Sequence, residues 1–398
     1  MAQANQPLGP RPILTLGVAA LLYAISLILI DIAPFFIGLY VDHLGFSLAQ
    51  AGLVQTIDQA GGVLGAIAGF FLMPRTSWRN LIAFAALIAT AANALTGMVD
   101  DYGLLLAVRF LSGFGVVLIT TVSACILARA AIPDRAFGVG LALGMALSAL
   151  AIWILDWLRL DYGNSFGLAS GAVWLGVGVL LALLLPGELG GHADAADLSI
   201  EAEHETGSLQ VGRSALISLG LFGISVNVVY GFLERVGLAN GLDNTGVASA
   251  LALGYVFATF GSLIPSIFGA AGGRLKWIVG TTVVFVASLF ALYSANTVAL
   301  YTAAYAVYAS VWNMGLAYYM SLTAENDPQE RYTRGMYIVN VAAQSLGPAI
   351  AAAILIGAPL ATIFVVAPLP AILAAMLVMW TVARQGGQEV SRTLDPIG

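Results

Sequence analysis

The chain has 398 residues, of which 60% are hydrophobic and only 9% are charged. A soluble globular domain carries about 25% charged residues, so this composition excludes a soluble domain and predicts an all-α integral membrane protein. The single cysteine, Cys125, excludes an intrachain disulfide and a thiolate metal cluster.

Twelve apolar stretches are long enough to cross a bilayer, because a membrane helix needs about 20 mostly apolar residues. Charge clusters, prolines and polar loops separate these stretches from one another. The predicted spans are 13–40, 48–73, 80–99, 103–128, 137–158, 165–185, 214–238, 245–270, 277–295, 298–322, 334–356 and 360–383.

The basic residues predict the orientation, since cytoplasmic loops carry an excess of Lys and Arg. With the N-terminus inside, only Arg159 and Arg235 fall outside, and Arg109 lies within the membrane. Both termini are therefore expected in the cytoplasm. Arginine outnumbers lysine fourteen to one, which favours a bacterial source and hence a multi-pass protein of the cell inner membrane. The residues placed inside are Arg11, Arg75, Arg79, Arg129, Arg135, Arg213, Arg274, Lys276, Arg331, Arg334, Arg384 and Arg392.

An acidic polar stretch divides the chain into two similar parts. We predict an N-terminal six-helix bundle at 1–186, an acidic cytoplasmic linker at 187–213 and a C-terminal six-helix bundle at 214–398. The loops at 133–138 and 328–335 both place proline, then arginine, then glycine before the next helix. Two six-helix halves in the same orientation are typical of the parallel repeat of one large transporter class.

Three charged residues fall inside predicted spans, where a charge costs about 2.5–3.5 kcal/mol. At 1.5 Å per residue, Asp31, Asp58 and Arg109 all lie roughly 9–15 Å from the outer end of their helices, so they can share a layer. Burial favours the neutral form of a carboxyl group and a nearby arginine favours its ionised form. The arrangement therefore predicts proton coupling. The alternative is a static buried ion pair that holds helices together.

The C-terminal part carries neutral polar and aromatic groups at mid-membrane depth. Tyr305, Tyr308 and Trp312 are spaced three and four apart and share one helical face. They are candidates for lining a site for a flat or amphipathic organic solute, and ordinary helix packing is the alternative. Glu234 and Arg235 lie near the outer end of their span, where interfacial positions are expected. The other substrate-binding candidates are Asn227, Tyr230, Asn313, Asn340 and Gln344.

Glycine and proline mark positions of helix packing or gating. Glycines that share a face with Asp58 allow close helix approach, and the alternative is a surface that slides when the two halves move. A proline shortly after Asp31 predicts a kink or a loosened backbone in the first helix. The gating and packing candidates are Pro34, Gly62, Gly65, Gly69, Gly113, Gly115, Gly347 and Pro348.

Arg109, Gly113 and Gly115 form the pattern Arg-x-x-x-Gly-x-Gly in the fourth predicted span. With twelve spans in a 6+6 arrangement and both termini inside, the chain resembles the major facilitator superfamily. That resemblance implies alternating access by two rocking halves and, for the motif arginine, a link to proton transfer. Two features depart from the family pattern. Met73 stands where the loop motif has aspartate, and the Gly-Pro pair of exporters is missing from the fifth span, with Gly347-Pro348 in the eleventh instead.

The sequence thus predicts a proton-coupled secondary transporter, with uptake symport of an organic or aromatic acid favoured. A drug or metabolite antiporter that exports its substrate is the first alternative, and a membrane-embedded enzyme or sensor is a remote one. The expected partners are a small organic solute, protons and the lipid bilayer, for a monomer that is not an enzyme. No cofactor or nucleic acid is expected, and without a Gly-x-x-x-x-Gly-Lys-Ser/Thr loop no nucleotide is expected either.

Overall fold

The computed structural model describes residues 11–127, 129–130, 133–187, 206–262, 264–268, 273–327, 332 and 336–394, and no strand occurs among them. The first helices are α1 (Pro12–Asp31), α2 (Ala33–Asp42), α3 (Leu48–Leu72), α4 (Trp78–Thr96), α5 (Tyr102–Leu127), α6 (Pro133–Tyr162), α7 (Asn164–Ala169) and α8 (Gly171–Leu183). The later helices are α9 (Thr206–Tyr230), α10 (Leu233–Ala239), α11 (Asn244–Ser262), α12 (Ile264–Phe268), α13 (Arg274–Ser294), α14 (Val298–Glu325), α15 (Met336–Leu355), α16 (Thr362–Val366) and α17 (Pro368–Leu394).

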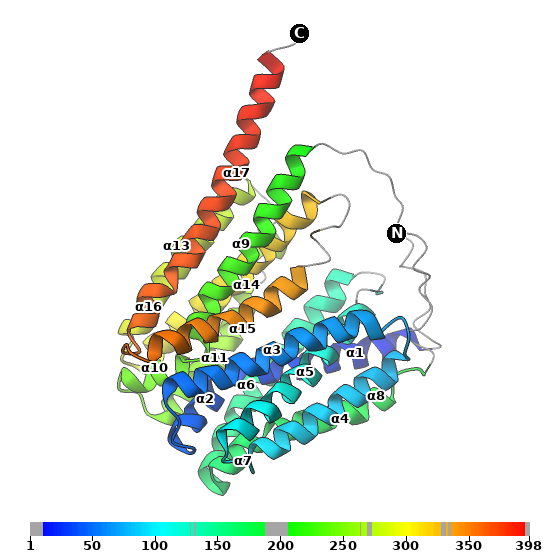
Figure 1. Cartoon of the computed structure of the whole chain (residues 1–398), viewed down its shortest axis with the longest axis vertical. Helices are drawn as coiled ribbons and strands as arrows, with labels where there is room; N and C mark the ends of the chain where they lie inside the picture. The colour runs from blue at the N-terminus through cyan, green and yellow to red at the C-terminus, as the bar shows by residue number, and fades with distance from the viewer. Residues whose placement is uncertain are drawn as a thin grey trace.

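The helices pack as two groups that follow chain order (Figure 1). We call α1–α8 the N-terminal group and α9–α17 the C-terminal group. In the N-terminal group α5 packs against α1, α3 and α4, and in the C-terminal group α14 packs against α9, α11 and α13. Each group therefore has a central helix that buries its small and aromatic residues against three neighbours.

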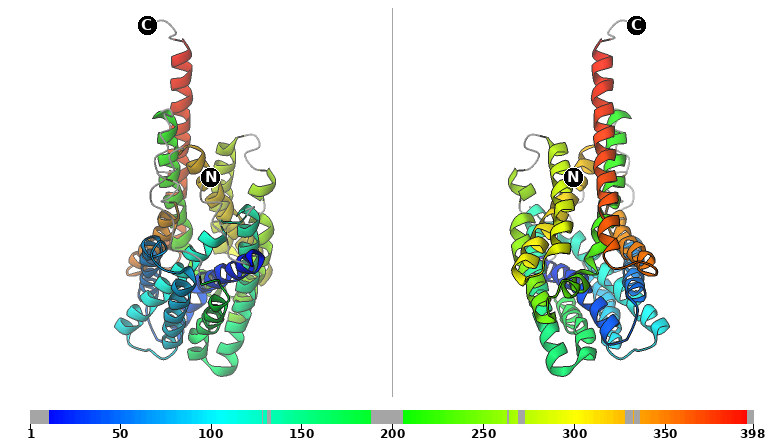
Figure 2. Two further views of the ribbon diagram at one scale, coloured as in Figure 1. Left: turned by 90° about the vertical axis from the view of Figure 1, so that its right-hand side faces the viewer. Right: turned by 90° about the vertical axis from the view of Figure 1, so that its left-hand side faces the viewer.

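The most extensive contacts between the two groups among the described residues are those of α3 with α15, α6 with α11, and α2 with α10. The helix axes of the two groups diverge from α2 and α10 toward the ends at which α1 and α9 begin (Figures 1 and 2). Helix α17 extends past its neighbours on that side. We call the side of α2 and α10 the joined end and the opposite side the diverging end. The predicted orientation makes the joined end the outer one.

Charged side chains link the groups at the joined end. Arg235 donates to both carboxylate oxygens of Asp42, with 2.8 Å between Nη1 and Oδ1. Its Nε lies 2.7 Å from Glu234 Oε2. Glu234 is 1% exposed, so it is enclosed by the protein, and its expected depth near the outer interface stays a prediction. Its carboxylate fits against Gly38, where a Cβ atom would come within 2.5 Å of Oε2. The absence of a side chain at Gly38 thus makes room for this buried acid.

Nine stretches of the described residues are helices long and apolar enough to cross a membrane. Helices α3 and α14 fall outside that set because glutamine and glycine in α3, and tyrosine in α14, lower the mean hydropathy. The apolar part of α11, Asn244–Phe260, is shorter than the others. The structure therefore supports a multi-pass helical membrane protein, and the count of twelve spans stays a prediction.

The predicted linker at 187–213 lies mostly outside the described residues, which omit 188–205. Helix α9 begins at Thr206, so the last residues of the predicted linker are helical. The first of the two predicted loops, 133–138, is helical in the structure, because α6 begins at Pro133 and includes it. Of the second, 328–335, only Tyr332 is described.

Candidate functional site

Two helix breaks meet between the groups. The first transmembrane helix of the N-terminal group stops at Asp31 and resumes as α2 at Ala33, as Pro34 predicts. The first helix of the C-terminal group stops at Tyr230 and resumes as α10 at Leu233. Interrupted helices at corresponding positions of two repeats are the usual place of substrate and ion sites in transporters.

Pro34 has a direct structural consequence at the first break. It has no N–H, so it cannot donate to the carbonyl of Ile30, four residues earlier. The Ile30 carbonyl instead accepts a hydrogen bond from the Tyr230 hydroxyl, at 3.2 Å. A proline in one group thus provides an acceptor for a tyrosine of the other.

Asp31 accepts hydrogen bonds from hydroxyl side chains of both the N-terminal and the C-terminal helix group. Ser148 of α6 donates to Oδ2 at 2.6 Å, and Tyr255 of α11 donates to Oδ1 at 3.0 Å. The hydroxyls of Tyr255 and Tyr230 lie 2.5 Å apart, which extends the network to the second helix break. The sequence analysis did not identify Ser148 or Tyr255. Ser148 continues a row of small residues with Gly140 and Gly144, and Tyr255 carries no comparable signal.

The aromatic residues expected to line the site divide into two sets. Trp312 is half-buried, with its ring centroid 5.1 Å from that of Tyr230. Tyr308 is fully buried and donates to the Val226 carbonyl at 2.7 Å. Tyr305 is also buried and packs over Gly254, where a Cβ atom would overlap its ring. The contacts of Tyr308 therefore favour helix packing. Tyr305 also contacts the Tyr255 ring, with 5.4 Å between centroids, and Trp312 contacts Tyr230 at the second helix break.

The four predicted amide residues are spread over α9, α14 and α15. The Asn227 side chain is buried and donates to the Gly223 carbonyl of its own helix at 2.8 Å. Asn313 and Asn340 are half-buried. Gln344 is also half-buried, and its Oε1 atom has no hydrogen-bond partner among the described residues. Gln344 is thus a half-buried amide whose buried oxygen is left unsatisfied by the described residues.

Asp58 and Arg109 form an ion pair inside the N-terminal group. Arg109 Nη2 lies 2.8 Å from Asp58 Oδ1. Arg109 Nη1 donates to Asn93 Oδ1 at 3.0 Å, and Asn93 in turn donates to Ser112 at 2.9 Å. The guanidinium also lies 5.1 Å from the centroid of the Phe36 ring. These contacts satisfy the buried arginine, and the sequence analysis missed Asn93 because an amide inside an alanine-rich helix gives no pattern.

The three predicted coupling residues thus occupy two environments. Asp31 is joined to neutral hydroxyl groups at the boundary of the two helix groups, and no ion pair to it occurs among the described residues. Asp58 and Arg109 are joined to each other within one group, between α3 and α5. Asp31 is therefore outside the Asp58–Arg109 ion pair, and the shared depth of the three residues stays a prediction.

Glycines bring α3 and α5 close enough for this ion pair. A Cβ atom at Gly113 would overlap the Asp58 carbonyl, and one at Gly65 would overlap the Phe114 carbonyl. Gly115 faces the other neighbour, since its Cβ atom would press on Ala85 of α4 at 2.5 Å. The two motif glycines therefore let α5 fit between α3 and α4. This favours the packing interpretation, because both sides of the seam belong to the N-terminal group.

The remaining glycine candidates also lie at close contacts between helices. Cβ atoms at Gly62 and Gly69 would contact Val117 of α5 at 2.6 Å and Leu118 of α5 at 3.2 Å. Gly347 of α15 lies against Asn227 of α9, and Pro348 is accommodated inside α15 without a break.

The comparisons with known proteins agree with this architecture. The sequence model described as Major Facilitator Superfamily matches residues 16–352. No curated protein sequence matches the chain. Solved transporters share the fold at low identity, and three of them illustrate the range.

A crystal structure of a variant of the nucleoside transporter NupG has a TM-score of 0.74 at 15% identity, over 92% of this chain and 99% of that one. A bacterial homologue of the human lysosomal transporter Spinster, inward-facing and unoccupied, gives 0.68 at 15% identity, over 95% and 98%. A POT family transporter in complex with 5-aminolevulinic acid gives 0.71 at 14% identity, over 93% and 96%. The family match over most of the chain and the shared fold lead to one conclusion. The chain belongs to the major facilitator superfamily of membrane transporters.

Proposed function

We propose that this chain is a proton-coupled secondary transporter that takes up a small organic solute by alternating access, with Asp31 as the coupling carboxyl group. One observation carries the proposal. Asp31 lies at the paired helix breaks and is hydrogen-bonded by Ser148 of its own group and Tyr255 of the other.

The chemistry of this contact links protonation to the arrangement of the two groups. A hydrogen bond to an ionised carboxylate is roughly twice as strong as one between neutral partners. Protonation of Asp31 removes that charge and weakens its bond to Tyr255. A proton therefore has a different affinity for the joined and separated arrangements, which is the requirement for coupling. We propose the Asp58–Arg109 ion pair as a second coupling element. This pair joins α3 to α5 inside the N-terminal group, which also carries Asp31.

The contacts of the basic residues favour an uncharged solute over the organic acid expected from the sequence. The guanidinium groups of Arg109, Arg159 and Arg235 are paired with Asp58, Asp156 and Asp42. A carboxylate solute would thus meet Asp31 and hydroxyl groups, with each of these cations already engaged. Tyr230, Tyr255 and Trp312 bring aromatic rings to the helix breaks, and aromatic surfaces of this kind suit a ring-containing solute. The nucleoside named for NupG is a solute of this kind.

Export of an organic cation by proton antiport is the second candidate. It is favoured by the same carboxylate in aromatic surroundings, because aromatic faces and Asp31 both attract a cation. Competition between a proton and a cation for one carboxylate couples their movements in opposite directions.

We further propose that the N-terminal and C-terminal groups are the two moving bundles, 1–186 and 214–398, joined by a cytoplasmic linker at 187–213. With both termini in the cytoplasm of a bacterial inner membrane, the diverging end faces inward. The structure then corresponds to an inward-facing arrangement, closed on the outer side by Asp42 and Arg235.

A proteoliposome assay with a lumenal pH dye tests the function. Wild type, Asp31→Asn and the exposed-loop control Asp100→Asn are each given uridine, benzoate and ethidium. The expected result is proton movement in the same direction as uridine, which Asp31→Asn abolishes and Asp100→Asn retains. Proton movement in the direction opposite to ethidium, with no proton movement for uridine or benzoate, supports the antiport candidate. Solute movement with no proton signal in any variant would overturn proton coupling.

A further inference from the structure

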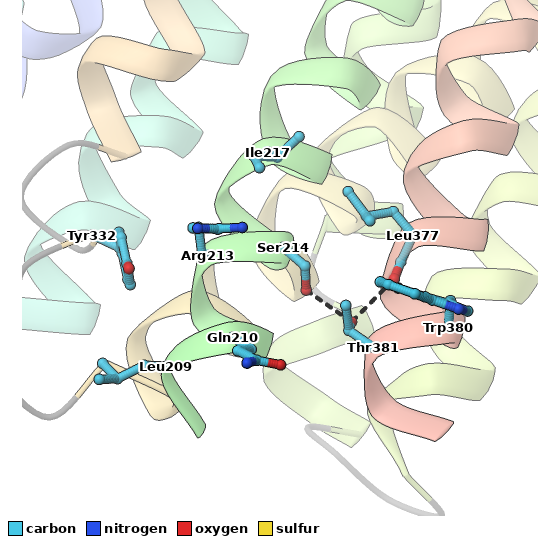
Figure 3. Close-up of a pocket in the computed structure, with 9 residues that line it drawn as sticks. All are labelled: Leu209, Gln210, Arg213, Ser214, Ile217, Tyr332, Leu377, Trp380 and Thr381. Carbon is cyan, nitrogen blue, oxygen red and sulfur yellow. Dashed lines mark hydrogen bonds between the residues drawn. The ribbon is translucent and has the colours of Figure 1, made fainter. Parts of the chain in front are cut away.

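A cavity of about 300 Å³ lies between α9 and α17 at the diverging end (Figure 3). Arg213 immediately precedes the predicted span 214–238, and Arg384 immediately follows the predicted span 360–383. The cavity is therefore at the depth of the lipid headgroups. Its lining residues are Leu209, Gln210, Arg213, Ser214, Ile217, Tyr332, Leu377, Trp380 and Thr381.

One side of the cavity is cationic and polar. Arg213 is exposed, and no carboxylate of the described residues lies within 4 Å of its guanidinium. The Arg384 guanidinium lies 4.2 Å from the centroid of the Trp380 ring, which brings a second cation to the rim. The nearby acid Asp327 is buried and accepts a hydrogen bond from the Tyr332 N–H.

The other side is apolar and continues along the outside of α17. Leu369, Leu373, Met376 and Trp380 are spaced four, three and four apart, so they share one helical face. All four side chains are more than half exposed. At the base of the cavity, Ser214 and Thr381 lie 2.8 Å apart and join α9 to α17 (Figure 3). The site thus combines a cationic end at headgroup depth with an apolar track that runs into the membrane.

We propose that this cavity binds an anionic phospholipid of the adjoining leaflet. The headgroup phosphate lies against Arg213 and Gln210, the Trp380 ring lies at the interface, and an acyl chain follows the apolar face of α17. Basic pockets between transmembrane helices on the cytoplasmic side are suited to anionic headgroups. The apolar lining favours a lipid over free phosphate, because inorganic phosphate gains nothing from Ile217, Leu377 or the track on α17.

Native mass spectrometry of the full chain tests the site. The purified protein is given equal amounts of phosphatidylglycerol and phosphatidylcholine, and the fraction that retains each lipid is measured. We expect wild type to retain phosphatidylglycerol preferentially. Arg213→Gln is expected to lower that retention about fivefold, since one basic residue near the membrane surface contributes about 1 kcal/mol. The control Arg75→Gln removes an exposed arginine of the same predicted side that lies outside the cavity, and it should retain the lipid as wild type does.

A second variant separates a built site from general surface charge. Leu377→Trp fills the cavity and leaves Arg213 in place, so it should also lose the bound lipid while the protein stays monodisperse. Equal retention of the two lipids by wild type would overturn the proposal, as would equal losses in Arg213→Gln and Arg75→Gln. Displacement of the bound lipid by millimolar inorganic phosphate would identify a simple phosphate site instead. Undiminished lipid retention in Leu377→Trp would also contradict the proposed phospholipid site.

Discussion

At the scale of single residues, Asp31 and Asp58 of the N-terminal group differ in what neutralises them. Asp58 has the guanidinium of Arg109 at 2.8 Å, and both belong to one rigid group. Among the described residues, hydroxyl groups are the donors to Asp31, and one of them, Tyr255, comes from the opposite group. Neutral donors compensate a buried charge less completely than a cation does. We therefore expect the charge of Asp31, rather than that of Asp58, to respond to movement between the groups.

Replacement of Tyr255 by phenylalanine tests that role. The loss of its hydroxyl destabilises ionised Asp31, so a proton is released only at higher pH. A hydrogen bond to a charged group contributes about 1.5–3 kcal/mol, and one pH unit corresponds to about 1.4 kcal/mol. We expect the pH of half-maximal proton-coupled uptake to rise by about one unit. Tyr308→Phe is the control, because that hydroxyl donates to the Val226 carbonyl. An unchanged midpoint in Tyr255→Phe would remove Tyr255 from the coupling network.

At the scale of the helices, α5 is the element on which the N-terminal group is built. It contacts α1, α3 and α4, and its two motif glycines face different neighbours. Without a driving force from water, helix association in lipid depends on close packing, which small residues permit. The motif therefore has a structural meaning besides its arginine. Gly113 and Gly115 set the distances at which Arg109 meets Asp58 and Asn93.

Gly113→Ala tests the seam between α3 and α5. The added methyl group would overlap the Asp58 carbonyl, so the helices must separate. We expect destabilisation by about 1–3 kcal/mol, the usual cost of overpacking. This should appear as a lower melting temperature of the detergent-solubilised protein. Gly280→Ala is the matched control, because a Cβ atom there meets nothing within 4 Å. Equal melting temperatures for the two variants would show that the seam has room for a side chain.

At the scale of the whole molecule, the described residues hold the two groups together at the joined end. The contacts across the boundary include the Asp42–Arg235 ion pair and the close approach of Gly52 of α3 to Ala352 of α15. Large movements of transporters are rocking motions of one bundle against the other around a fixed site. We therefore expect the contacts at the joined end to break in each transport cycle, and those inside a group to persist.

A disulfide across the boundary tests this requirement. A Cβ atom at Gly52 would lie 3.1 Å from that of Ala352, near the spacing of about 3.8 Å in disulfides. In a Cys125→Ser background, the oxidised Gly52→Cys/Ala352→Cys protein should lose transport and regain it on reduction. The control pair Ala86→Cys/Gly178→Cys joins α4 to α8 within one group, with 3.9 Å between the Cβ positions. It should transport in both redox states. Full transport by the oxidised Gly52–Ala352 pair would exclude rocking about this boundary.

The sequence by itself determined the class of the molecule and its elements. An apolar content of 60% leaves a bilayer as the suitable solvent, and the helix boundaries follow from local charge, proline and hydropathy. The break after Asp31 was predictable because Pro34 removes a backbone donor within the same helix. Arg109 was predictable as functional or paired, because a cation in hydrocarbon needs compensation.

Only the tertiary structure decided which groups meet. Asp31 and Tyr255 are 224 positions apart, and whether a given face of α11 turns toward α1 depends on how two bundles dock. The same holds for Asn93, which reaches Arg109 only because α4 packs on α5. Glu234 is buried because Gly38 of the other group leaves space for it. Local patterns specify which residues are costly to bury, and long-range packing specifies the partners that compensate them.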